Sequence, residues 1–252
     1  MTKRKGGVII KKEPNGSIPL DPIYCGNFKG YRYLCYLKSY CTYDGDREYL
    51  VNLPSRNQIS KESGISLPTI RKYDNHMREI KYLGEDNSFI QSMELMNNKE
   101  LVKKIKDDIR YDYEKLNGRK NGLPEISSRL YLDLDRDNYF VTMSRKDLLT
   151  LGCIGRISWL NKYKDWAPYV ILYCRNWLNI SKGNQVMIYP SKICESAGVD
   201  IHSAAKVKEA IELLISHQVI DGELKDRTDG RGNILFLNDI DITPLENEIN
   251  LQ

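Results

Sequence analysis

Apolar side chains recur every three to four residues in several segments, a spacing typical of helices with one buried face. Residues 27–42 and 168–178 each predict an aromatic-rich helix of this kind. In a third segment, Ile70, Tyr73 and Met77 fall on one side of a helix, and polar residues occupy the other sides. The pattern therefore predicts a mainly helical chain in which each helix buries one apolar face.

Short apolar or alternating runs separated by turn residues predict strands. Three hairpins are expected, over residues 82–90, 130–143 and 220–237. The tip of the first is acidic, which argues against contact with phosphate groups. The third contains Asp-Gly, a strong turn signal, and has cations near its tip. A long charged helix is expected over residues 97–117, followed by a glycine-containing linker over 118–124.

Two segments, about half a chain apart, follow the same order of elements. Tyr-Leu-Val-Asn-Leu-Pro-Ser at residues 49–55 is echoed by Gln-Val-Met-Ile-Tyr-Pro-Ser at residues 185–191. Each copy follows an aromatic-rich helix and leads into a helix that ends at a glycine, Gly64 or Gly198. An amphipathic helix and an apolar pair come next in both copies. A repeat of this size predicts two structural units in one chain.

Serine residues stand where three of these helices are expected to begin. Ser55, Ser66 and Ser191 are predicted to accept hydrogen bonds from the first backbone N–H groups of their helices. Pro68 lies in the first turn of the helix after Ser66, where its missing N–H costs nothing. The turn between the two helices is about three residues longer in the second copy, so the copies are not interchangeable.

Charge and cysteine content narrow the class of protein. A net charge of +4 permits binding to nucleic acid without requiring it. The six cysteines include no C-x-x-C pair, so buried free thiols are expected rather than disulfides. No segment approaches the roughly 20 apolar residues that span a bilayer, and no signal-peptide pattern follows the basic N-terminus. The sequence thus predicts a soluble, cytoplasmic protein that does not engage a membrane.

Residues 59–83 and 190–220 resemble the winged helix-turn-helix superfamily. The resemblance lies in the pattern I-x-x-x-x-G-[IV]-x-x-x-T-[IV], an amphipathic helix, and an apolar pair that enters a hairpin. The first copy keeps the Thr-Ile pair at 69–70, whereas the second has Lys-Val at 206–207. This difference makes base contacts a firmer expectation for the first copy than for the second.

The resemblance implies an α+β, mainly helical fold with two winged helix-turn-helix domains, an internal duplication joined by a helix and a hairpin. The domains are expected at residues 21–96 and 130–240, with a linker helix and loop at 97–129. Paired units of this kind resemble the replication initiators and replisome organisers of plasmids and phages. The same architecture also serves transcription regulators.

In a helix-turn-helix, the second helix enters the major groove and presents its N-terminal side chains to base edges. Arg71 has the hydrogen-bonding groups for guanine, and Asn75 has those for adenine. Thr69, Lys72 and Ser203 are expected to contact phosphates instead. The residues expected to bind DNA are Ser66, Pro68, Thr69, Arg71, Lys72, Asn75, Arg78, His202, Ser203, Lys206, Lys225, Arg227 and Arg231.

No catalytic set emerges from the sequence. His76, His202 and His217 are the only histidines, and none has a metal-ligand spacing with a cysteine. Neither G-x-x-x-x-G-K-[ST] nor a strand-linked G-x-G-x-x-G is present. The expectation is therefore a protein that is not an enzyme and needs no cofactor.

Double-stranded DNA is the expected partner, and sequence-specific binding at a plasmid or phage replication origin is the first expectation for function. The alternative is a transcriptional repressor or activator of a mobile element. A third hypothesis is that one winged helix serves as a protein-interaction or dimerisation module. A homodimer and other replication or transcription proteins are therefore further expected partners.

Overall fold

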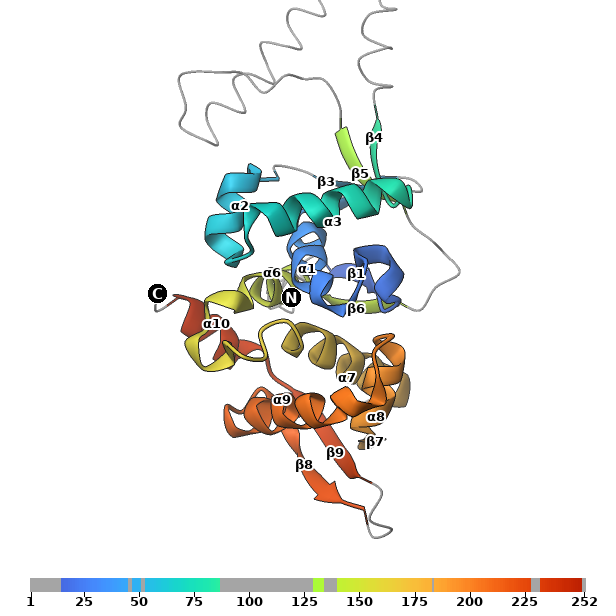
Figure 1. Cartoon of the computed structure of the whole chain (residues 1–252), viewed down its shortest axis with the longest axis vertical. Helices are drawn as coiled ribbons and strands as arrows, with labels where there is room; N and C mark the ends of the chain where they lie inside the picture. The colour runs from blue at the N-terminus through green and yellow to red at the C-terminus, as the bar shows by residue number, and fades with distance from the viewer. Residues whose placement is uncertain are drawn as a thin grey trace, which may run out of the picture.

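The protein is α+β and mainly helical, as the sequence predicts. A computed structural model describes residues 15–44, 47–50, 53–86, 129–133, 140–182, 184–227 and 232–250. Helices form the middle of the molecule, and one pair of strands projects from each end of its long axis (Figure 1). Within the described ranges, no helix combines the length and the apolar character needed to cross a bilayer.

In the first half of the protein, residues 15–133, helix α1 is followed by two strands, then by a pair of helices, and then by two more strands. Its strands β2, β3, β5 and β4 form an antiparallel sheet in that spatial order, so β3 lies beside β5. The elements are β1 (Asn15–Pro19), η1 (Pro22–Cys25), η2 (Phe28–Gly30), α1 (Tyr31–Ser39), β2 (Cys41–Asp44), β3 (Arg47–Leu50), α2 (Arg56–Ser63), α3 (Leu67–Glu79), β4 (Leu83–Asp86) and β5 (Arg129–Asp133).

The second half, residues 140–250, also has a helix before a pair of helices and two strands after that pair. One strand stands before the pair where the first half has two, and a further helix lies near each end of this half. Its strands β7, β9 and β8 form a second antiparallel sheet, so the strand before the helix pair again lies beside the last strand. The elements are β6 (Phe140–Ser144), α6 (Arg145–Cys153), η3 (Ile154–Arg156), η4 (Ser158–Leu160), α7 (Ala167–Ser181), β7 (Val186–Ile188), α8 (Pro190–Ser196), η5 (Ile201–Ser203), α9 (Ala204–Ser216), β8 (Ile220–Asp226), β9 (Asn233–Ile240) and α10 (Thr243–Asn250).

Two of the three predicted serine caps are confirmed. The hydroxyl of Ser55 accepts a hydrogen bond at the start of α2, and that of Ser66 does so at the start of α3. Gly64 ends α2 in the left-handed region, with φ of 68°. The prediction for Ser191 is wrong, because α8 begins one residue earlier with Pro190 in its first turn. Proline fits there since its fixed φ suits a helix start.

The hairpin predicted over residues 220–237 is confirmed by the pairing of β8 with β9. The hairpin predicted over residues 130–143 is wrong. β5 pairs with β3 and β4, whereas β6 pairs with β1 in a separate two-stranded sheet. Each run does form a strand, but a distant strand supplies a better partner and buries Leu132 completely. Residues 130–133 therefore belong to the sheet of the first half, although the sequence assigned residue 130 onward to the second domain.

Several predicted features lie outside the described residues. They include the return strand of the hairpin over 82–90, and the helix and linker over 97–124; the basic N-terminus up to residue 14 also lies outside them. The described part of β4 pairs with β5, which begins 43 positions after Asp86.

The two halves share one continuous hydrophobic core. α1 packs against α6, and β1 of the first half pairs with β6 of the second. Aromatic rings cross the boundary, with Phe28 stacked on Trp166 at 3.9 Å and Tyr31 against Tyr169 at 4.9 Å between centroids. The halves are thus joined by packing and not only by the chain between them.

The prediction of buried free thiols is confirmed, since all six cysteines are free and buried. Burial raises the pKa of Cys41 and of Cys174 to about 12, and that of Cys153 to about 11. Because the thiolate is the reactive form, these thiols are inert near neutral pH.

We therefore expect a disulfide reagent such as DTNB, applied at pH 8, to modify the native protein slowly. Unfolding in guanidinium chloride should expose all six thiols and let them react within minutes. Following the released chromophore measures both rates. A native thiol that reacts as fast as free cysteine would contradict the buried placement.

Candidate nucleic-acid interface

Helix α3 presents a polar face to solvent and an apolar face to the core. Ile70 and Met77 are fully buried, whereas Arg71, Lys72 and Asn75 are exposed. The helix lies between α1 and the projecting strands β4 and β5 (Figure 1). The structure thus brings three predicted DNA-binding residues together on one accessible helix face.

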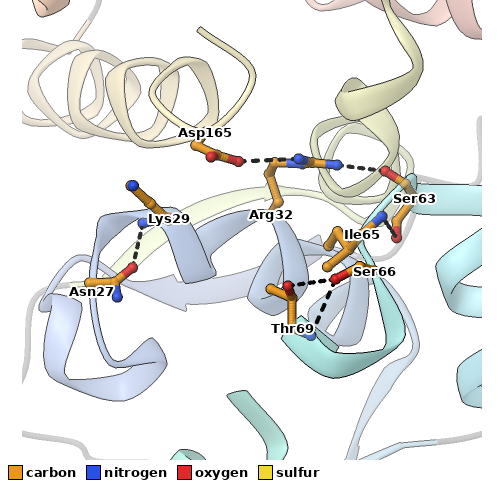
Figure 2. A network of polar contacts seen from close by, with 8 residues as sticks. All are labelled: Asn27, Lys29, Arg32, Ser63, Ile65, Ser66, Thr69 and Asp165. Carbon is orange, nitrogen blue, oxygen red and sulfur yellow. Dashed lines mark hydrogen bonds and ion pairs between the residues drawn. The ribbon is translucent and has the colours of Figure 1, made fainter. Parts of the chain in front are cut away.

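The first turn of α3 carries two hydroxyl groups and an exposed proline. The Ser66 hydroxyl accepts a hydrogen bond from the Thr69 backbone N–H at 3.4 Å, and the two side-chain oxygens lie 2.7 Å apart (Figure 2). Pro68 is exposed beside them. The partial positive charge of a helix N-terminus favours anions at such a position.

Buried polar contacts fix α3 in place. Asp74 is 3% exposed and accepts hydrogen bonds from the Tyr33 hydroxyl of α1 at 2.5 Å and from Arg56 Nε of α2 at 2.6 Å. Burial, together with the charge of Asp74, raises the pKa of Tyr33. The ring nitrogen Nε2 of His76 lies 2.6 Å from the carbonyl oxygen of Ile23. The exposed side chains of α3 therefore project from a helix whose orientation is set.

Arg78 differs from the other predicted contacts on α3. Its guanidinium forms an ion pair with Glu85 of β4 at 2.7 Å, with both side chains about 40% exposed. This pair links the C-terminal part of α3 to the projecting strand. Arg78 is therefore engaged within the protein, at the opposite end of the helix from Ser66.

In the second half, the predicted residues divide between two elements. His202 and Ser203 lie on η5, before α9 begins, so the prediction that both lie on the second helix is wrong. The extra residues of the longer turn form η5, and the Asp200 carboxylate accepts a hydrogen bond from the His202 N–H at 2.8 Å. Lys206 lies in the first turn of α9 and is exposed.

Residues 159–163 lie along one side of α9. The Tyr163 hydroxyl and the Lys162 ammonium donate hydrogen bonds to Glu209, and these bonds lower the pKa of that carboxyl. Two turns further on, the Trp159 ring stacks on His217 at 3.7 Å, with the planes 3° apart. This side of α9 is therefore occupied by the protein's own chain, unlike the exposed face of α3.

The predicted contacts on the second strand pair lie beside aromatic rings. Lys225 is 5.4 Å from the Phe236 ring centre and forms an ion pair with Glu223 at 2.8 Å. Arg227 is 5.2 Å from the ring centre of Tyr189. Arg231 lies outside the described residues.

The fold also brings two cations to α3 that the sequence analysis missed. Lys29 of η2 and Lys164, which precedes α7, line the same cavity as Ser66, Thr69 and Lys72. They come from segments distant in the sequence, so no local pattern could identify them. Across the described ranges, no three His, Cys, Asp or Glu side chains are grouped to hold a metal ion.

Comparisons of the chain with models of protein families, with curated proteins and with solved structures find no match. Function is therefore inferred from the arrangement of α3 and its neighbours.

Proposed function

We propose that the protein binds double-stranded DNA in a sequence-dependent manner, with α3 as its recognition helix. The observation that carries this proposal is the exposed group of Arg71, Lys72 and Asn75 on a helix whose other face is locked into the core. A helix of 13 residues is about 20 Å long, and a single helix fits the major groove. Arginine and asparagine are side chains that pair with guanine and adenine edges there.

We infer that each half is a winged helix-turn-helix unit. In each half a helix, one or two strands, two helices and two strands follow one another, and in both halves the strand directly before the helix pair lies beside the last strand. In this interpretation α2 and α3 form the first helix-turn-helix, and α8 and α9 form the second. The strand pairs that project from the two ends are the wings.

The two units have unequal roles in this proposal. α3 contacts bases, whereas α9 is engaged along one side by residues 159–163. The second unit then contributes phosphate contacts through η5, Lys206 and its wing. An alternative is that the second unit binds a protein partner instead of DNA, because these contacts leave less of α9 free to enter a groove.

Two such units in one chain support binding at a replication origin of a plasmid or phage as the biological role. Regulation of transcription in a mobile element is the second candidate, since it uses the same binding chemistry. The genomic neighbourhood of the binding site separates the two roles, because an origin carries repeated sites and an operator lies at a promoter.

We expect the affinity for the best duplex to fall steeply with salt. If about six phosphates are neutralised, the logarithm of the association constant should fall with the logarithm of salt concentration at a slope near −5. Selection from randomised duplexes supplies the ligand, and fluorescence anisotropy at several salt concentrations measures the slope. A single strand of the same sequence is the control and should bind more weakly, since it offers no major groove.

The absence of duplex binding by the full chain would overturn the proposed function. An affinity that does not change with salt would overturn the electrostatic part of it.

A further inference from the structure

A cavity of about 400 Å³ opens between the first turn of α3, the segment from η2 to α1, and residues 164–165 before α7. It lies where the two halves meet, because the third of these segments belongs to the second half. Figure 2 shows Ser66 and Thr69 at the start of α3, Lys29 and Arg32, and Asp165 around this region.

The lining of the cavity is strongly cationic. Lys29, Arg32, Lys72 and Lys164 contribute four positive charges and Asp165 one negative charge, an excess of three positive charges among the lining residues. The hydroxyl groups of Ser66 and Thr69 add neutral hydrogen-bonding partners. Such a set of cations and hydroxyls suits an anion with several oxygen atoms.

Arg32 makes this a built site rather than a group of surface lysines. Its side chain is 4% exposed, and its guanidinium donates to the Ser63 carbonyl at 2.7 Å and to Asp165 Oδ1 at 3.2 Å. Its Nε is buried and has no hydrogen-bond partner within the described structure. The protein therefore holds a fixed positive charge at the wall of the cavity, with part of its donor capacity unused.

The backbone is shaped to admit this guanidinium. A side chain at Gly155 would place its Cβ 1.8 Å from an amino nitrogen of Arg32, so only glycine allows the guanidinium to lie there. The nearby Gly64 has φ of 68°, which other residues rarely adopt. Gly64 follows α2 and Gly155 belongs to η3, so the two glycines lie close together where the two halves meet.

We propose that this cavity binds one phosphate group, and that the phosphate belongs to the DNA backbone next to the bases contacted by α3. The inference rests on the proposed duplex binding. The helix N-terminus, the fixed guanidinium and the three lysines all favour an anion at this place. Because Lys164 belongs to the second half, a phosphate bound here is held by both halves at once.

The test compares Lys164→Ala with Lys162→Ala in the full chain. Lys162 is a matched control because it lies two residues away but pairs with Glu209 and does not line the cavity. Lys164→Ala should weaken duplex binding about tenfold for all sequences alike and reduce the salt slope by about 0.9. Lys162→Ala should leave both quantities unchanged.

A duplex with a single neutral methylphosphonate locates the phosphate. Scanning this group along the selected site should reveal one position where the loss of affinity is large for the wild type and clearly smaller for Lys164→Ala, in which Lys29, Arg32 and Lys72 still line the cavity. Asp165→Asn keeps an oxygen that accepts the hydrogen bond from Arg32 but removes the negative charge from the cavity. It should therefore tighten binding and steepen the salt slope.

The outcomes separate the inference from the function it rests on. If the proposed function is wrong, the wild type does not bind a duplex at all. Intact duplex binding with no methylphosphonate position coupled to Lys164 would overturn the phosphate site. Titration with inorganic phosphate tests whether the cavity binds free phosphate. If inorganic phosphate binds in a Lys164-dependent manner and duplex binding does not depend on Lys164, the cavity binds free phosphate and the assignment to DNA is wrong.

Discussion

Replacing Lys38 by methionine is expected to lower the free energy of unfolding by about 3–5 kcal/mol, the usual cost of leaving a buried charge unpaired. Lys38 of α1 and Glu48 of β3 form an ion pair with side chains 0% and 1% exposed. Burial alone lowers the pKa of Lys38, but the neighbouring Tyr82 and Glu48 outweigh it and raise the pKa above its ordinary value. The ammonium therefore stays charged, and its removal strands the carboxylate of Glu48.

Urea denaturation measures this loss. Lys61→Met is the control, because Lys61 is exposed on α2 and its replacement should change stability little. The double variant Lys38→Met, Glu48→Leu should recover most of the lost stability, since it removes both charges from the interior. A single variant within 1 kcal/mol of the wild type would show that Glu48 finds water or another partner.

Replacing Arg71 by alanine is expected to weaken binding to the selected duplex by about 1–3 kcal/mol and to relax the preference at one base pair. The guanidinium is exposed on the face of α3 that projects from the core. Asn75→Ala should have an effect of the same size at a second base pair, since Asn75 lies one helical turn further on. Selection from randomised duplexes with each variant measures the change in preference.

Arg71→Lys distinguishes a base contact from a phosphate contact. Lysine keeps the charge but lacks the paired donors that match the guanine edge, so the preference should stay relaxed while the salt slope stays unchanged. Glu79→Ala, at the far end of α3, is the control and should preserve the preference. An unaltered preference in Arg71→Ala would remove this residue from base recognition.

The local features of the fold could be predicted because their causes are local. Apolar spacing places Ile70 and Met77 in the core, and the hydroxyls of Ser55 and Ser66 begin helices that the following residues continue. The predicted helix start at Ser191 was wrong because Pro190 already begins α8 one position earlier. A cap residue therefore indicates a helix start only when the preceding residue cannot itself begin the helix.

Strand partners could not be predicted in the same way. The run over residues 130–134 has the pattern of a strand, but the pattern contains no information on which strand lies beside it. β5 pairs with β3 and β4, and long stretches of chain separate it from both. Nearness in sequence favoured the wrong hairpin with β6.

The candidate site could be predicted only where its residues depend on local sequence. The exposed residues Arg71, Lys72 and Asn75 follow from the helical period of α3. The pairing of Arg78 with Glu85, and the contribution of Lys164, depend on the three-dimensional fold. Helical periodicity therefore predicts the face of a helix but not its neighbours.

The continuous core also has a consequence for the shape of the bound DNA. Phe28 on Trp166, Tyr31 on Tyr169 and the packing of α1 on α6 hold the two halves at one angle. If both halves contact one duplex, the protein does not change its shape to fit the DNA. The duplex instead has to bend or twist to meet a rigid surface. Smooth bending of a site of 20–30 base pairs by 40–90° costs on the order of 1–6 kcal/mol. Flexible steps such as TA or CA would reduce that cost, so the protein would favour them at positions it never touches.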